Sequence, residues 1–198
     1  MSRRWQRARL GEVLERTEAI NPLDCPEREF EYVDVSSISN KTFRIEQTQR
    51  VSGKSAPSRA RRIIRADDVL FATVRPTLRR VAIVPEELEG QLCSTGYFVF
   101  RPKPVVYCRF LFYFLLSDEF VGRMGKLQKG ASYPAVTDTQ VRSQPFAFPS
   151  VDEQRRLVGV LDQAFAATAI AKTSAKTKLL RLDELENSLI HEAFNGRL

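Results

Sequence analysis

The sequence predicts an α+β protein, in which a mixed, strand-rich domain over residues 1–150 precedes one long, coiled-coil-forming helix over residues 151–198. Short apolar runs closed by prolines fill the first part, as in strands that end at a turn. After Ser150 there is no further proline, and apolar residues recur at heptad spacing. The net charge of +7 lies wholly in residues 1–150, because residues 151–198 hold seven basic and seven acidic residues.

The predicted strands follow one another through the first hundred residues. Residues 32–35 alternate between apolar and polar side chains, as a half-buried strand does. Residues 69–74 form an apolar run that predicts a buried strand stopped by Pro76. Residues 80–84 and 97–100 predict two more strands, each closed by a proline.

Short helices and loops complete the predicted domain. Residues 106–116 have helical spacing, and Ser117 is a suitable N-cap for a second short helix that runs towards Leu127. Residues 130–134 are expected to form a loop, and residues 145–149 a short extended exit from the domain.

The long helix has a start, a stop and an apolar stripe. Ser150 and Glu153 match a capping box, and Gly196 is expected to stop the helix. Val158, Phe165, Leu179 and Ala193 form a flanking apolar line. The stripe itself, called the heptad seam below, has only two polar members and consists of Leu157, Leu161, Ala164, Thr168, Ala171, Ala175, Lys178, Leu182, Leu185 and Leu189.

The length of this helix predicts a partner. About 44 residues with a rise of about 1.5 Å each make a rod of roughly 65 Å. A domain of about 150 residues has an expected diameter near 40 Å, so part of the heptad seam must pair with another helix, and we expect a homodimer. The alternative is a helix that breaks near Thr173 and Ser174 and folds back as a hairpin. The alanine-rich middle favours a continuous helix.

Positive charge concentrates between Lys54 and Arg80, where eight basic residues face only Asp67 and Asp68. Such a surplus attracts polyanions, and the arginine guanidinium fits both phosphate and the guanine edge. The alternative is a solvated basic face without a partner.

Residues able to carry catalysis are few, so we expect no enzyme activity, no metal and no cofactor. His191 is the one histidine, and it falls in the last turn of the predicted helix, where a cation suits the helix dipole. One histidine and three scattered cysteines compose no zinc site, and neither a phosphate-binding glycine loop nor an amino-methyltransferase motif is present. A turn before Val69 explains Asp67 and Asp68 better than a nuclease site, because adjacent strand residues point to opposite faces.

Membrane and disulfide signals are also weak. No apolar run approaches the roughly 20 residues that span a bilayer. The odd number and wide spacing of Cys25, Cys93 and Cys108 form no disulfide framework. We therefore expect a cytoplasmic protein without membrane contact.

Seven short stretches resemble, in sequence order, segments of the specificity (S) subunits of type I restriction-modification systems. Each stretch is weak alone, but seven in the expected order are specific. They are Trp5 with residues 10–13, residues 32–38, residues 58–62 with 68–76, residues 94–97, residues 130–136, residues 149–158 and residues 189–198.

The resemblance implies a DNA target-recognition domain over residues 1–150 and a dimerisation and spacer helix over residues 151–198. Family members usually carry two recognition domains and two helices that pair antiparallel, whereas this chain has one of each. It is similar to a single-domain half-subunit or to a fragment of a longer subunit, and Met1 together with the family-like end favours the half-subunit. The implied partners are double-stranded DNA, DNA methyltransferase (M) subunits, and through them a restriction and translocase (R) subunit.

Two alternatives stay open beside this interpretation. One is a recognition module of a single-chain restriction enzyme. The other is a non-enzymatic helical adaptor whose positive charge serves RNA or an acidic protein.

The residues expected to bind DNA come from three segments. The segment 54–62 is predicted to be a loop in which Ser55, Ser58 and Arg59 meet base edges while Arg61 and Arg62 meet phosphates. The proline after Arg75 is expected to keep that residue extended. For each candidate the alternative is an ordinary surface or loop residue, and for Arg75 a buried framework residue. The full set is Lys54, Ser55, Ser58, Arg59, Arg61, Arg62, Arg75, Arg79, Lys129, Ser132 and Tyr133.

Overall fold

A computed structural model describes residues 5–196 of the chain, which divides into two units, residues 1–155 and residues 156–198. Arg197 and Leu198, which end the last of the resembling stretches, lie outside the described residues, as does Met1. The predicted fold class is confirmed, because a mixed, strand-rich domain is followed by one long helix.

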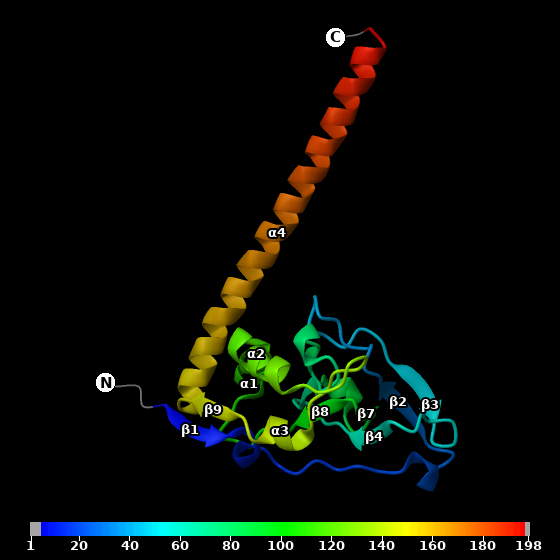
Figure 1. The fold of residues 1–198 in the computed structure, drawn as a ribbon, viewed down its shortest axis with the longest axis vertical. Helices are drawn as coiled ribbons and strands as arrows, with labels where there is room; N and C mark the ends of the chain where they lie inside the picture. The colour runs from blue at the N-terminus through cyan, green and yellow to red at the C-terminus, as the bar shows by residue number, and fades with distance from the viewer. Residues whose placement is uncertain (1–4, 197–198) are drawn as a thin grey trace. The chain divides into compact units, whose positions relative to one another are not determined.

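Three sheets are present among the described residues of the first unit. The four-stranded sheet has the order β3 (Gln49–Ser52), β2 (Glu29–Val33), β7 (Leu92–Ser94) and β4 (Ala60–Ile63), with β2 and β7 parallel. The three-stranded antiparallel sheet has the order β6 (Val81–Ile83), β5 (Val69–Ala72) and β8 (Tyr97–Phe100). β1 (Gln6–Arg9, blue in Figure 1) pairs with β9 (Pro145–Phe148, yellow), although the two strands come from opposite ends of the domain sequence.

The continuous apolar run in β5 results from burial on both of its faces, since all four of its residues are buried. Leu70 and Ala72 belong to a core cluster shared with Val33 and Cys93 of the four-stranded sheet. Phe71 points the other way and meets the ring of Phe120 with 5.2 Å between ring centroids. Phe120 belongs to helix α2 (Asp118–Leu127), so the three-stranded sheet lies between the four-stranded sheet and this helix.

Three α-helices complete the described part of the first unit: α1 (Cys108–Leu116), α2 (Asp118–Leu127) and the short α3 (Asp138–Arg142). The predicted N-cap of α2 is confirmed, because the Ser117 side chain accepts a hydrogen bond from the N–H of Phe120. Helix α1 begins two residues later than the predicted start at residue 106.

Helix α4 runs without a break from Val151 to Phe194 over 44 residues. Thr173 and Ser174, where the alternative hairpin would turn, lie inside the helix. Gly196 follows with a φ of +67°, a left-handed conformation that glycine adopts freely and that ends the helix as predicted.

Two local predictions were wrong. Residues 60–63 form strand β4, whereas the sequence predicted that the loop continues to residue 62; Arg61 and Arg62 therefore lie on a strand. Arg75 is left-handed (φ 49°, ψ 57°) and not extended, because its N–H turns to donate to the Pro134 carbonyl over 2.7 Å as the chain enters a short 3-10 helix. Within the described residues, no helix is both long and apolar enough to cross a membrane.

Candidate nucleic-acid interface

Three turns from separate parts of the sequence leave the same end of the two sheets. In the antiparallel pairs, Ala60 lies opposite Ser94 and Ala72 lies opposite Tyr97. The chain just before β4, just after β7 and just after β5 therefore emerges at one place. These turns, together with the loop 129–136, are called the loop edge below; it comprises residues 58–59, 73–75, 95–96 and 129–136.

A chain of hydrogen bonds joins the parts of the loop edge. The N–H of Thr95 donates to the Arg59 carbonyl over 2.9 Å. The N–H and the hydroxyl of Thr73 both donate to the Gly96 carbonyl, each over 2.9 Å. The Thr73 carbonyl in turn accepts from the N–H of Val136 over 3.0 Å. The four segments therefore form one connected surface.

The loop 129–136 closes on itself and carries an exposed aromatic ring. Lys129 and Ala135 exchange two backbone hydrogen bonds of 2.9 Å. Tyr133 at the tip is 73% exposed. The Arg75 guanidinium lies 5.3 Å from the centre of that ring and donates to the Ser132 carbonyl over 3.2 Å. Arg75 thus links two parts of the loop edge while it stays exposed.

Arg59 and Lys129 are the cations that the loop edge presents without a partner, as far as the described residues go. Both are exposed, and neither side chain makes a hydrogen bond or an ion pair within residues 5–196. A phosphate or a base edge could therefore bind either of these side chains without displacing an existing partner.

Arg61 and Arg62, predicted to bind phosphate, both have partners within the protein. Arg61 falls where the β4–β7 register shifts, a bulge that re-aims its side chain. Its guanidinium donates to the Ser58 carbonyl over 3.0 Å and to Asn21 Oδ1 over 2.7 Å, so it braces the turn that holds Arg59. Arg62 forms an ion pair of 2.8 Å with Asp138, with its side chain 20% exposed.

Three other predicted residues lie away from the loop edge. Lys54 and Ser55 occupy the turn after β3, where the Lys54 N–H donates to the Pro26 carbonyl over 3.0 Å and the Ser55 hydroxyl bonds to Ser52. Arg79 pairs with Asp118 at the start of α2. Six of the eleven predicted residues therefore lie together on the loop edge, and their contact with DNA stays a prediction: Ser58, Arg59, Arg75, Lys129, Ser132 and Tyr133.

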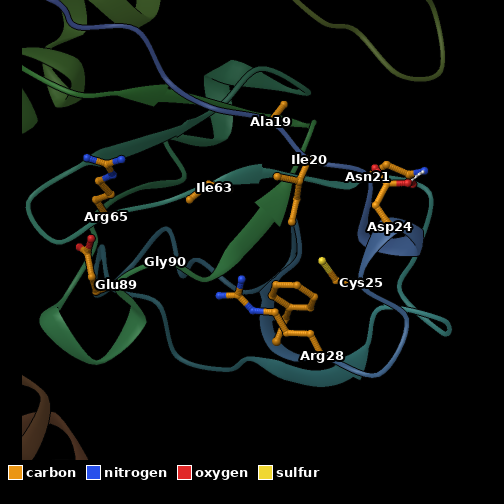
Figure 2. A pocket seen from close by; sticks show the side chains of 11 residues that line it. Ala19, Ile20, Asn21, Asp24, Cys25, Arg28, Ile63, Arg65, Glu89 and Gly90 are labelled. Atoms are coloured by element: carbon orange, nitrogen blue, oxygen red, sulfur yellow. Dashed lines mark hydrogen bonds between the residues drawn. The ribbon is translucent and has the colours of Figure 1, made fainter.

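A pocket lies at the opposite end of the four-stranded sheet, beyond Ile63 of β4 (Figure 2). The Arg28 guanidinium lies 4.8 Å from the centre of the Phe30 ring within it, and Cys25 lines the same wall. No predicted DNA-binding residue lines this pocket. Within the described residues, no group of three His, Cys, Asp or Glu side chains is placed to hold a metal ion.

A buried ion pair, which sequence analysis missed, also lies at that opposite end. Val69 and Phe100 are register partners, so Asp68 and Arg101 meet at the ends of β5 and β8. Arg101 donates to both Asp68 oxygens, over 2.9 and 2.8 Å, and to Glu18 over 2.8 Å. The hydrogen bonds with Asp68 raise the pKa of Arg101, which keeps it charged. The hydrogen bond from Arg101 lowers the pKa of Glu18.

The turn predicted for Asp67 and Asp68 is present, with Asp67 at a φ of +64°. One feature of the sequence could have indicated the ion pair between Asp68 and Arg101. Asp68 directly precedes one apolar strand, and Arg101, of opposite charge, directly follows another. Burial raises the pKa of Asp68, and the hydrogen bonds from Arg101 and the Arg65 N–H oppose that shift.

The second unit exposes an apolar surface. In the half of α4 that approaches the C-terminus, the heptad-seam residues Leu182, Leu185 and Leu189 are 56%, 54% and 47% exposed. Thr168, a polar member of the seam, donates a hydrogen bond from its hydroxyl to the Ala164 carbonyl over 2.8 Å, so this polar group has a partner within the helix.

Comparisons with known proteins agree with the features above. The family described as "Type I restriction modification DNA specificity domain" matches residues 2–181. The specificity subunit of the type I restriction enzyme HindI of Haemophilus influenzae is 24% identical over 133 residues, which are 66% of this chain and 28% of that protein.

Two solved structures are more similar in sequence. The HsdS subunit from Thermoanaerobacter tengcongensis is 40% identical, with a TM-score of 0.78 over 83% of this chain and 43% of the other. A structure described as the basis of complex assembly and conformational transition of the type I R-M system is 39% identical, with a TM-score of 0.80 over 85% and 44%. The chain thus spans less than half the length of these relatives.

Proposed function

The chain belongs to the type I restriction modification DNA specificity family, and from that membership we propose that it recognises a short sequence in double-stranded DNA through the loop edge. The observation that carries the proposal is the gathering of Arg59, Arg75, Lys129 and Tyr133 from three distant segments onto one connected surface. Recognition of duplex DNA needs cations that set the register on phosphates and side chains that reach base edges. The loop edge supplies both kinds.

The chain itself is proposed to be catalytically silent and to direct partner subunits to the site. One relative is described as a specificity subunit of a type I restriction enzyme, and one solved structure is described as that of a type I R-M system. In the assembly that we propose, methyltransferase subunits bind this chain and modify the DNA, and a restriction and translocase subunit joins through them. The purified chain should neither methylate nor cut DNA when it is given S-adenosylmethionine, ATP and magnesium.

We further propose a homodimer formed through the heptad seam of α4. The supporting observation is the row of leucines that α4 leaves exposed. A two-fold dimer places identical recognition domains on the DNA, so the target should be an interrupted palindrome. Expressing the chain with its methyltransferase partner and sequencing the methylated DNA tests this directly. An asymmetric motif would contradict the homodimer.

Arg59→Ala is expected to reduce binding to the specific duplex about 5- to 150-fold more than binding to random duplex. A bidentate contact from arginine to guanine contributes about 1–3 kcal/mol of discrimination. Fluorescence anisotropy with both duplexes measures the ratio. Arg16→Ala is the matched control, because Arg16 is exposed and lies outside the loop edge. Equal losses on both duplexes would show that Arg59 contacts phosphate only.

Lys129→Ala is expected to weaken binding to all duplexes about equally. A lysine on phosphate carries no sequence information, and its loss reduces the slope of log K against log salt by about 1. Titrations between low and moderate salt give that slope. An unchanged slope would place Lys129 outside the DNA contact.

A further inference from the structure

Thr95, which was not among the residues predicted to bind DNA, lies at the centre of the loop edge. It is exposed, whereas its neighbours Ser94 and Gly96 are buried. Its N–H donates to the Arg59 carbonyl, one residue beyond the Ala60–Ser94 register pair. Thr95 and Arg59 are therefore opposite each other across two antiparallel segments. Residues in such positions have Cβ atoms about 4.5–5.5 Å apart, so their side chains are neighbours.

The backbone on either side of Thr95 is firmly held. The Gly96 carbonyl accepts two hydrogen bonds from Thr73, and the Gly96 N–H donates to the Ser94 hydroxyl over 3.2 Å. A Cβ on Gly96 would lie 2.5 Å from Val35 Cγ2, so the turn packs directly against that residue. A short, β-branched side chain on such a turn has few alternative positions. Recognition of a base edge requires a side chain whose position is held by the surrounding packing and hydrogen bonds.

We propose that Thr95 is a specificity-determining residue, which contacts the base pair next to the one that Arg59 contacts. This inference rests on the proposed DNA-recognition function. Arginine reads guanine through two hydrogen bonds, while threonine offers a methyl group for thymine and a hydroxyl for either donor or acceptor groups. Neighbouring strands lie about 4.8 Å apart, and successive base pairs rise about 3.4 Å. Side chains on neighbouring strands therefore reach adjacent base pairs.

Selection of binding sites from a random duplex library tests the proposal with the full-length chain. Wild type, Arg59→Ala and Thr95→Ala are each taken through the same selection. The Arg59→Ala motif should lose its preference at one position of each half-site, and the Thr95→Ala motif should lose about tenfold preference at an adjacent position of each half-site. Because Thr95 is exposed, the thermal midpoint of unfolding should stay at the wild-type value, which shows that the variant is folded.

Two conservative variants identify the group that makes the contact. Thr95→Val keeps the methyl group and Thr95→Ser keeps the hydroxyl, so one of these variants should lose the preference and the other should retain it. If the methyl group makes the contact, replacing the thymine at that position by uracil should weaken wild type and leave Thr95→Ser unaffected.

The inference is overturned if Thr95→Ala selects the wild-type motif, loses preference at a non-adjacent position, or binds every sequence equally less well. Each of those results leaves the proposed function intact, because wild type still selects a motif. A wild-type chain that selects no motif overturns both the proposed function and this inference.

Discussion

Replacing Asp68 by Ala is expected to lower the free energy of unfolding by about 3–5 kcal/mol, the range observed when one partner of a buried ion pair is removed. Asp68 is 1% exposed and Arg101 is 8% exposed, so the guanidinium left behind would stay largely out of water. The Arg65 N–H would also lose its acceptor at 2.8 Å. Urea denaturation followed by circular dichroism measures the change as a fall in the midpoint.

Glu18→Ala is the matched control for that substitution. Glu18 accepts from the same guanidinium, but its side chain is 47% exposed. Water can replace it, so a loss of no more than about 1 kcal/mol is expected. The double variant Asp68→Leu with Arg101→Met removes both charges and should recover much of the lost stability. Equal losses for Asp68→Ala and Glu18→Ala would show that burial of the pair is incomplete in solution.

Replacing Leu182 and Leu185 together by Asp is expected to convert the proposed homodimer into a folded monomer. Each dimer would then hold four carboxylates in the heptad seam, and each carboxylate loses hydration when the helices pair. We expect the dissociation constant of the dimer to increase more than about 1000-fold, which corresponds to about 4 kcal/mol. Multi-angle light scattering reports the mass, and methylation of the full site in the presence of partner subunits should be lost with it.

Thr173→Asp with Asn187→Asp is the control for the added charge. Both residues occupy the heptad position on the side of α4 opposite the seam, so this variant should remain dimeric. A wild-type chain that is monomeric at micromolar concentration would contradict the homodimer. The exposed leucines would then be available for a different helical partner.

The strands that were predicted well are those with a strong local pattern. The runs around Val69 and Tyr97 are apolar throughout because their sheet is covered on both faces. The sequence predicts a loop where β4 lies because the strand's sequence, ARRI, is half arginine. It forms a strand because β7 offers a hydrogen-bonding edge, and Arg61 and Arg62 find partners in Asn21 and Asp138.

The amino-acid sequence alone predicts the long helix, its ends and its heptad pattern of apolar residues, since helical periodicity, Ser150 and Gly196 act through residues at most a few positions apart. It also determined which segment concentrates arginine. Which of those arginines are available to a ligand depends on contacts between segments that lie far apart in the sequence. Arg62 is committed to Asp138, 76 residues away, while Arg59 stays unpaired among the described residues and lies beside Thr95. The register between β4 and β7 places Arg59 opposite Thr95, and the packing of α3 brings Asp138 to Arg62. Both pairings depend on which distant elements meet, which no local pattern records.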